Sequence, residues 1–282
     1  MIYLNGQWMP IEEAKIPVLD RGFIFGDGIY EVIPVYRRKA FRAHGHLQRL
    51  ARSLASIRIE NPHDEAGWMA LMAEIVARQP FENQGVYFQV TRGVARRDHA
   101  FPRESTPTVF MMSNPLATPS EETYAKGVAC VSAIDNRWLR CDIKSTSLLG
   151  NVLMRQFAAD HDAIETVMFR AGLLTEASAS NVLIVKDGVI ASPHKDNLIL
   201  PGITLDATID LARETGLPLE MRAITEAEVR CADELWLSSS TKEVLAITTL
   251  DGKPVGHGAG AGKPGLMFAK MRAAYQAAKA AL

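Results

Sequence analysis

The sequence is first notable for what it has little of. Its 282 residues include only three cysteines, Cys130, Cys141 and Cys231, which are widely separated and form no Cys-x-x-Cys pair. An odd number of isolated cysteines predicts reduced thiols that pack in the interior, and it argues against a disulfide framework. The formal net charge is -1, so no excess of positive charge favours a nucleic acid partner.

Long apolar runs are also absent. No stretch of 18 uncharged apolar residues occurs, and Met1–Gly6 lacks the charged region and long apolar run of a secretion signal. We therefore expect a cytoplasmic protein without membrane association. Hydrophobic residues nevertheless make up 48% of the chain, which is enough for a substantial core, and the length is typical of two domains.

The spacing of apolar residues predicts mixed strands and helices in two blocks. Asn5-Gly6 supplies the positive φ angles of a type I′ turn, so residues 1–10 are predicted to form a hairpin. In the first block we expect strands at 28–36, 86–91 and 108–113, and helices at 44–57 and 65–79. In the second we expect strands at 128–134, 166–169, 182–186, 189–191 and 234–238, and helices at 148–161, 203–215 and from about 266.

A connection between the two blocks is predicted at residues 114–120. This segment has two prolines and no periodicity. The predicted domains are therefore a small N-terminal α+β domain at 1–117 and a larger C-terminal domain of mixed α/β structure at 118–282.

Lys144 is the first candidate for chemistry. It lies near the apolar residues Trp138, Leu139, Ile143 and Leu148. A partly desolvated lysine amine loses its proton more easily and can form a Schiff base with a carbonyl. A lone lysine is more often a solvated surface charge, so this interpretation depends on other segments.

Several segments could bind an anion such as a phosphate. Pro201-Gly202 precedes an amphipathic pattern, so the N–H groups of Ile203 and Thr204 would lie unpaired at a helix N-terminus. Ser239-Ser240 follows a predicted strand, and Arg49 could add a forked, charged contact. Each feature alone also fits a structural role without a ligand: an ordinary helix start, a polar loop or a solvated helix face.

Taken together, the motifs resemble a known family over about residues 1–250. They are Asp20-Arg21-Gly22, Phe25 to Val32, His46 to Leu50, Tyr87 to Gly93, Arg137 to Ser145, Leu148-Leu149-Gly150, Glu176 to Asn181 and Gly202-Ile203-Thr204. In this order they are similar to the fold-type IV pyridoxal-phosphate enzymes, the branched-chain-aminotransferase-like class IV family, and most of all to its D-amino-acid aminotransferases. The segment around Lys144 is highly specific, whereas the serine tracts are weak by themselves. The resemblance implies a two-domain α/β (α+β) fold with a barrel-like C-terminal domain.

The resemblance also implies roles for the candidate residues. Lys144 would hold pyridoxal 5′-phosphate as a Schiff base and later move a proton at the substrate α-carbon. Glu176 would pair with the pyridine nitrogen of the cofactor. The other implied cofactor contacts are Arg49, Ser178, Ser180, Asn181, Ile203, Thr204, Ser239 and Ser240. The implied reaction is ping-pong transfer of an amino group between an amino acid and a 2-oxo acid.

Substrate choice depends on Arg97 and His99. Residues two apart on an extended segment point the same way, so both side chains could converge on one carboxylate; a charged surface loop is the usual alternative. The resemblance implies a clamp for the substrate α-carboxylate, supplied across the interface of a homodimer and assisted by Tyr30, with Val32 nearby. It favours D-amino acids such as D-alanine, with 2-oxoglutarate or pyruvate as acceptor.

Three other functions stay open. A 4-amino-4-deoxychorismate lyase would share Lys144 and Glu176, although the Arg97 and His99 pair argues against it. A cofactor-binding protein without catalysis would need no substrate clamp. A branched-chain L-aminotransferase or an R-selective amine transaminase can be separated only by a panel of substrates.

A metal site is not expected. His44 and His46 have no carboxylate or cysteine at ligand spacing, and histidines at a helix start are more often surface groups.

Pro34, Ala177 and Ala179 depart from the family pattern and leave the preferred side chain of the substrate open.

Overall fold

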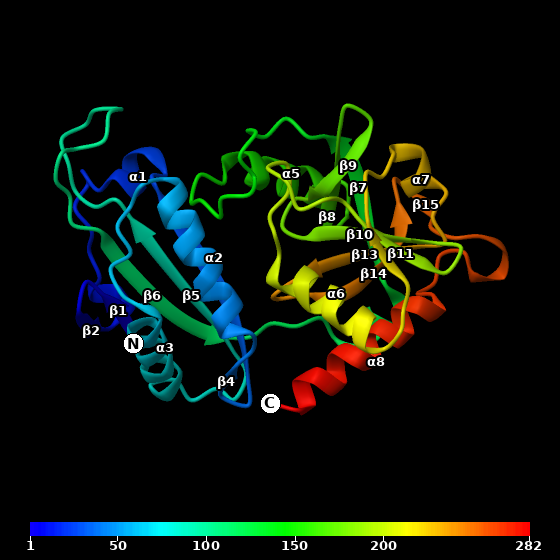
Figure 1. The fold of residues 1–282 in the computed structure, drawn as a ribbon, viewed down its shortest axis with the longest axis horizontal. Helices are drawn as coiled ribbons and strands as arrows, with labels where there is room; N and C mark the ends of the chain where they lie inside the picture. The colour runs from blue at the N-terminus through cyan, green and yellow to red at the C-terminus, as the bar shows by residue number, and fades with distance from the viewer. The chain divides into compact units, whose positions relative to one another are not determined.

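The computed structural model describes the whole chain, Met1–Leu282, and divides it into two compact units (Figure 1). The first unit comprises Met1–Ala117, Ile143–Leu148 and Leu282, and the second comprises Thr118–Asp142 and Leu149–Ala281. The predicted division at residue 117 leaves Ile143–Leu148 with the C-terminal block, whereas in the structure this segment belongs to the first unit. The reason is backbone pairing, because Ser145 forms a bridge with Ile29.

A six-stranded antiparallel sheet forms the first unit, in the order β2-β1-β6-β5-β3-β4. Its strands are β1 (Ile2–Leu4), β2 (Gln7–Met9), β3 (Gly28–Tyr36), β4 (Lys39–Ala40), β5 (Gln84–Thr91) and β6 (Thr108–Pro115). The predicted hairpin is confirmed, since β1 pairs with β2 around Asn5 and Gly6, whose φ angles are 48° and 88°. Asn114 and Pro115 continue β6, so the predicted connection begins later than expected.

Three helices accompany this sheet: α1 (Arg21–Phe25), α2 (Ala43–Ser56) and α3 (Glu65–Ala77), with a 3-10 turn at Ile11–Glu13. The helix α2 packs against β3, and α3 packs against β5 and β6. The stripe at Leu47, Leu50 and Leu54 is buried, together with Ile29 and Ile33 of β3. Burial of one such side chain stabilises the fold by roughly 1.5–3 kcal/mol, so the predicted helical stripe forms the core of this unit.

The second unit contains a nine-stranded mixed sheet. Its main path runs β12-β11-β10-β13-β14-β7-β8-β9, and β15 pairs with β14. The pairs β7–β8, β7–β14 and β11–β12 are parallel, and the other pairs are antiparallel. Because β9, at one end of the path, also contacts β10, the sheet curls on itself. The predicted fold class, with a barrel-like C-terminal domain, is confirmed.

The elements of the second unit are largely those predicted. The strands are β7 (Val128–Ile134), β8 (Glu165–Arg170), β9 (Leu173–Ala177), β10 (Asn181–Lys186), β11 (Val189–Ser192), β12 (Leu219–Met221), β13 (Glu234–Ser239), β14 (Glu243–Leu250) and β15 (Lys253–Pro254). The helices are α4 (Glu121–Lys126), α5 (Leu149–Ala159), α6 (Ile203–Glu214), α7 (Glu226–Arg230) and α8 (Leu266–Ala280), with a 3-10 turn at Gly258–Gly260.

Sequence patterns missed several short or fully buried elements. The strand β14 lies inside the sheet and its residues from Val244 to Ile247 are buried on both faces, so they show no alternation of polar and apolar residues. The helix α1 has only five residues, which is too short for a periodic signal. Cys130 and Cys141 are buried as predicted, but Cys231 is exposed. None of the helices combines the length and apolar character needed to span a bilayer.

Candidate functional site

Lys144 lies in the segment that pairs with β3. The Tyr30 N–H donates to the Lys144 carbonyl at 3.0 Å, and the Lys144 N–H donates to Ser53 Oγ at 3.4 Å. The neighbours Ile143 and Ser145 are buried, whereas Lys144 itself is half-buried. The backbone of the lysine is therefore fixed while its side chain stays partly open to solvent.

The surroundings of the lysine amine differ from those expected. Trp138 and Leu139 are 48% and 61% exposed, so these two residues do not form a buried apolar enclosure. The amine Nζ of Lys144 instead lies 4.2 Å from the ring centroid of Tyr30. An aromatic face at this distance attracts the ammonium form and positions the amine on one face of β3.

Tyr30 and Val32, the predicted substrate residues, lie on the same face of β3. Both are half-buried, while the alternating residues Ile29, Glu31 and Ile33 are fully buried on the other face. This alternation is the period of two of a β-strand. The structure therefore brings Tyr30, Val32 and the Lys144 amine to one half-buried surface.

Glu31, on the buried face of β3, holds the side chain of Arg49. Its Nε and Nη2 donate to the two carboxylate oxygens of Glu31 at 2.7 and 2.8 Å, and His46 Nδ1 lies 2.7 Å from Glu31 Oε2. Although burial opposes the effect, Arg49 and His46 lower the pKa of Glu31 to about 2. The prediction that His46 is a surface group is wrong, because it is 1% exposed and burial lowers its pKa. Glu31 is thus a permanent charge that orients the Arg49 guanidinium.

Glu176 lies in β9 of the second unit. Its Oε1 accepts a hydrogen bond from Arg137 Nη1 at 2.7 Å, and its Oε2 accepts from Leu200 N at 2.9 Å and Asn181 Nδ2 at 3.2 Å. Burial raises the pKa of Glu176, and Arg137 only partly opposes this. The carboxylate is therefore fixed in place but more basic than an ordinary glutamate.

The start of α6 lies beside Asn181 and the end of β13. Gly202 is the N-cap of α6 and has no side chain to cap the first amides, which belong to Ile203 and Thr204. An added Cβ on Gly202 would lie 2.1 Å from Asn181 Oδ1, and Asn181 pairs with Ser238 across β10 and β13. The Ser238 Oγ is buried without a protein partner. Uncapped amides and a spare hydroxyl form a suitable seat for an anion.

Two of the predicted serines have other partners, which involve Glu165. The Ser178 hydroxyl donates to Glu165 Oε2 at 3.1 Å, the Ser180 hydroxyl donates to Oε1, and the Ala179 N–H donates to Oε2 at 2.7 Å. Lys242 Nζ pairs with Glu165 at 2.8 Å. Glu165 is fully buried and organises the turn between Glu176 and Asn181. Sequence reasoning missed it, because no local pattern links β8 to this turn.

The predicted phosphate serines after β13 are less enclosed. Ser239 and Ser240 are half-buried, and the Ser239 Oγ accepts a hydrogen bond from Lys242 N at 3.2 Å. Their hydroxyls therefore remain able to donate to a ligand.

Arg97 and His99 lie in the exposed loop between β5 and β6. The loop bends at both residues, so the strand alternation expected from sequence does not align them. They gather instead on Phe25 of α1: the Arg97 guanidinium lies 5.6 Å from the ring centroid, and the two ring centroids of His99 and Phe25 are 5.5 Å apart. Both side chains therefore lie against one aromatic residue that sequence reasoning did not single out, and their convergence on a carboxylate stays a prediction.

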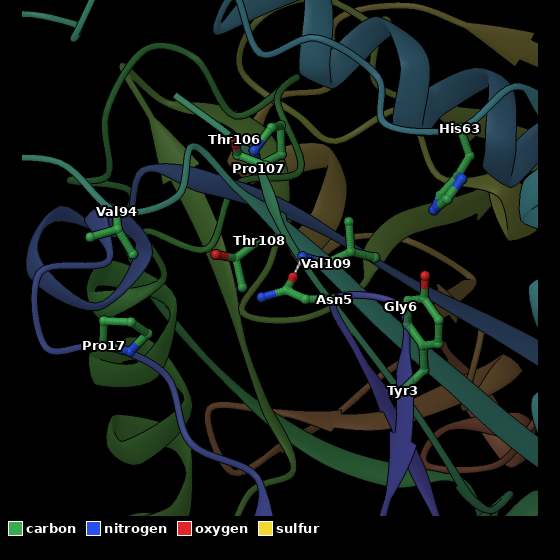
Figure 2. Close-up of a pocket in the computed structure, with 10 residues that line it drawn as sticks. All are labelled: Tyr3, Asn5, Gly6, Pro17, His63, Val94, Thr106, Pro107, Thr108 and Val109. Carbon is green, nitrogen blue, oxygen red and sulfur yellow. Dashed lines mark hydrogen bonds between the residues drawn. The ribbon is translucent and has the colours of Figure 1, made fainter. Parts of the chain in front are cut away.

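A separate pocket of about 650 Å³ lies on the first unit, between the β1–β2 turn and the start of β6 (Figure 2). The Val109 N–H donates to the Asn5 side chain at 2.8 Å, and the Thr108 hydroxyl donates to Asp20 at 2.6 Å. The pocket includes none of the predicted site residues, and the side chains of Asn5 and Thr108 are already paired.

Comparison with known proteins identifies relatives over almost the whole chain. The family model described as amino-transferase class IV matches residues 28–250. The D-alanine aminotransferase of Bacillus licheniformis is 39% identical over 275 residues, which cover 98% of this chain and 95% of the relative. The D-alanine aminotransferase of Staphylococcus aureus (strain MW2) is 39% identical over 258 residues, 91% of each chain.

A solved structure shows the same fold. The branched-chain amino acid aminotransferase of Escherichia coli matches with a TM-score of 0.90 at 23% identity, over 98% of this chain and 93% of the other. The resemblance predicted from sequence is confirmed, while the roles of individual residues and the absence of a metal stay predictions.

Proposed function

The chain belongs to the class IV aminotransferase family, and we propose that it transfers amino groups between D-amino acids, such as D-alanine, and 2-oxo acids. The proposed acceptors are 2-oxoglutarate and pyruvate, and the proposed cofactor is pyridoxal 5′-phosphate. The observation that carries this proposal is the near full-length similarity to D-alanine aminotransferases at 39% identity. The matches cover 95% and 90% of the length of those relatives.

The residues of the second unit fit the proposed cofactor. A basic, buried carboxylate at Glu176 suits a protonated ring nitrogen, and the amides of Ile203 and Thr204 suit a phosphate. The buried, unpaired hydroxyl of Ser238 supports a polar ligand at this place, because buried polar groups normally have a partner. Ser239 and Ser240 would add hydroxyl donors to the phosphate.

The residues of the first unit fit further parts of the proposed chemistry. Bound pyridoxal phosphate supplies an aldehyde carbon and an electron-accepting ring. Lys144 would hold it through its amine and, once released, would take the proton from the substrate α-carbon at Nζ. Tyr30 would keep this amine in position, and Arg49, oriented by Glu31, would donate to the phosphate.

Selection of D-amino acids is assigned to Arg97 and His99. An arginine fork and an imidazole gathered on one ring can bind a carboxylate together. Both residues are exposed, which suits a clamp that serves the active site of a second copy. We therefore propose a homodimer that shares its active sites.

An exposed apolar stripe on α5 supports the homodimer. Leu149, Val152, Leu153 and Phe157 share one side of this helix at helical spacing and are 72%, 58%, 57% and 36% exposed. Contiguous exposed apolar residues of this kind are typical of protein interfaces. The oligomeric state is tested by light scattering, and a monomer that transaminates at full rate would refute the shared site.

The proposed function is tested by a paired assay with pyridoxal 5′-phosphate supplied. D-alanine is offered as donor to 2-oxoglutarate, and L-alanine and L-leucine are offered in parallel. Turnover of the D-donor alone supports the proposal, whereas turnover of the L-donors alone refutes D-selectivity and keeps the cofactor chemistry. If neither donor reacts, release of pyruvate from 4-amino-4-deoxychorismate is measured, and its appearance would identify a lyase instead.

A further inference from the structure

A buried arginine holds the exposed loop that carries Arg97 and His99. Arg21 is 3% exposed, and its Nη1 donates to the carbonyl oxygens of Asp98 at 2.6 Å and Ala100 at 3.4 Å. Its Nη2 lies 3.5 Å from the His99 carbonyl oxygen. Since these carbonyls belong to the loop itself, one rigid side chain fixes the backbone on both sides of His99.

Asp27 fixes this arginine and a second one. Its Oδ2 accepts hydrogen bonds from Arg21 Nε and Arg92 Nε, both at 2.7 Å, and its Oδ1 accepts from Arg92 Nη2 at 3.0 Å. The Arg92 guanidinium stacks 3.7 Å from the ring centroid of Phe101, which follows His99 in the same loop. We refer to Arg21, Asp27 and Arg92 as the loop anchor, because these residues contact the loop at two places.

Local sequence explains why α1 presents the required residues. Asp20 caps the helix by accepting from Gly22 N at 2.8 Å, and Gly26 ends it in the left-handed conformation at φ 64°. Between these caps, Arg21 and Phe25 are four residues apart and share one face, with the guanidinium 4.8 Å from the ring centroid. The same ring then receives Arg97 and His99.

We propose that the loop anchor positions Arg97 and His99 for the carboxylate of the substrate, and so sets the preference for amino acids over amines without a carboxylate. This inference rests on the proposed function. A preordered loop binds a ligand without losing loop entropy at that moment, and a carboxylate clamp requires two side chains in fixed relation. The loop anchor, together with Phe25, acts here through positioning and does not touch the substrate.

The inference is supported by the chemistry of the anchor. Hydrogen bonds from Arg92 and Arg21 outweigh the burial of Asp27 and hold its pKa below the ordinary value. Two buried guanidinium groups share this single carboxylate, so the loop is held by charged contacts, which are stronger than neutral ones.

The test compares D-alanine with D-alaninol, which carries a CH₂OH group in place of the carboxylate. The first half-reaction is followed as the change in visible absorption of the bound cofactor, for wild type, Arg21→Met, Arg21→Lys and Phe25→Leu. We expect the apparent second-order rate for D-alanine to fall about tenfold or more in Arg21→Met, which corresponds to loss of one charged contact. The rate for D-alaninol should be unchanged. The rate of Arg21→Lys for D-alanine should lie between those of wild type and Arg21→Met, because lysine keeps the charge but lacks the forked guanidinium.

Three further variants make the result decisive. Arg103→Met carries a comparable change in the same loop at an exposed position, and it should behave as wild type. Arg97→Met should lower the rate for D-alanine selectively, and the Arg21→Met/Arg97→Met double variant should be no worse than Arg97→Met alone if both act through one clamp. If Arg21→Met does not fold, Arg21→Lys and Phe25→Leu decide the question.

The outcomes separate the two proposals. If Arg97→Met lowers the rates for D-alanine and D-alaninol equally, or lowers neither rate, the carboxylate clamp of the proposed function is wrong. If Arg97→Met is selective for D-alanine but Phe25→Leu and the Arg21 variants slow both substrates equally, the anchor has only a structural role, and this inference is overturned.

Discussion

Two buried glutamates, one in each unit, are both paired with an arginine and yet have opposite properties. Glu31 and Glu176 are 0% and 5% exposed, so loss of hydration is severe for both. The pKa of Glu31 nevertheless falls to about 2, whereas the pKa of Glu176 rises. Burial alone therefore does not determine the protonation of a carboxylate in this protein.

The difference arises from how each arginine divides its donors. Arg49 gives Nε and Nη2 to Glu31, which also faces His46. Arg137 gives Nε and Nη2 to Asp135 at 3.0 and 2.9 Å, and only Nη1 to Glu176. As a result Arg137 helps to hold the pKa of Asp135 at about 2 against burial, while Glu176 receives less compensation.

This division suits different tasks. A carboxylate with a full arginine fork is a permanent charge that orients its partner, as Glu31 orients Arg49. A carboxylate with a single donor from a shared arginine remains basic, which suits a group that must keep a proton on a neighbouring ligand nitrogen. The comparison predicts that loss of Glu176 harms catalysis, whereas loss of Glu31 first harms stability.

The largest effect is expected for Glu176→Gln. A neutral amide cannot keep a proton on the cofactor ring, so we expect kcat to fall by about 10²–10⁴-fold, the range for a positioned proton-transfer group. The measurement is kcat with D-alanine at saturating pyridoxal phosphate. Glu122→Gln is a matched control, since its ion pair with Lys126 is exposed and contributes little. A normal kcat in Glu176→Gln would contradict the assignment.

Glu31→Gln should reduce stability most. Removing one partner of a buried ion pair leaves the Arg49 charge uncompensated, which costs about 3–5 kcal/mol. The measurement is urea unfolding at fixed protein concentration and pH 7, with Glu122→Gln as control. An unfolding free energy equal to that of the wild type would show that Glu31 is not the fixed charge described here.

The same carboxylate gives a pH dependence with a definite sign. Glu31 has a folded pKa of about 2 and an ordinary value of 4.5, so its contribution is complete above pH 4.5 and is lost as pH falls from 4.5 towards 2. Its total is about 3 kcal/mol, from 1.36 kcal/mol per unit. Urea unfolding across this range should show a steeper acid loss in wild type than in Glu31→Gln; parallel curves would refute the linkage.

Arg137→Met should change the pH profile of activity. Without Arg137 the main group that opposes the effect of burial is gone, so the pKa of Glu176 should rise further. The carboxylate must be ionised to accept a hydrogen bond from the protonated ring nitrogen, and the acidic limb of the kcat/KM profile should therefore move to higher pH. The control is Arg140→Met, because Arg140 is exposed and pairs with Asp142. An unshifted limb would show that Arg137 does not act through Glu176.

Local sequence patterns predicted much of this structure. The strands β3 and β7 begin and end as predicted, because their apolar runs are bounded by glycines or by polar turns. The motif around Lys144 identified the family, which the comparisons confirm. The lysine, the glutamate and the helix start are each defined by residues adjacent in sequence.

Contacts between distant residues could not be predicted in this way. Glu165 meets the serine turn only because β8 and β9 pair, and Arg137 reaches Glu176 from 39 residues away. Phe25 lies in a helix too short to be recognised, yet it brings Arg97 and His99 together. Such contacts depend on strand register and on side-chain direction, which neither composition nor periodicity contains.

His46 provides the smallest and most specific test of the contrast between Glu31 and Glu176. It is buried beside an ionised Glu31, yet burial keeps its pKa below 6.5, so the neutral ring donates from Nδ1 to the carboxylate. The unfolded chain takes up this proton at a higher pH than the folded chain does, and stability should therefore fall as the pH is lowered from 6.5 towards 5. In His46→Asn, which keeps a donor but cannot titrate, this part of the slope should disappear. Glu31 titrates only below this window, so an unchanged slope would mean that His46 is charged in the folded protein and that Glu31 carries two cationic partners.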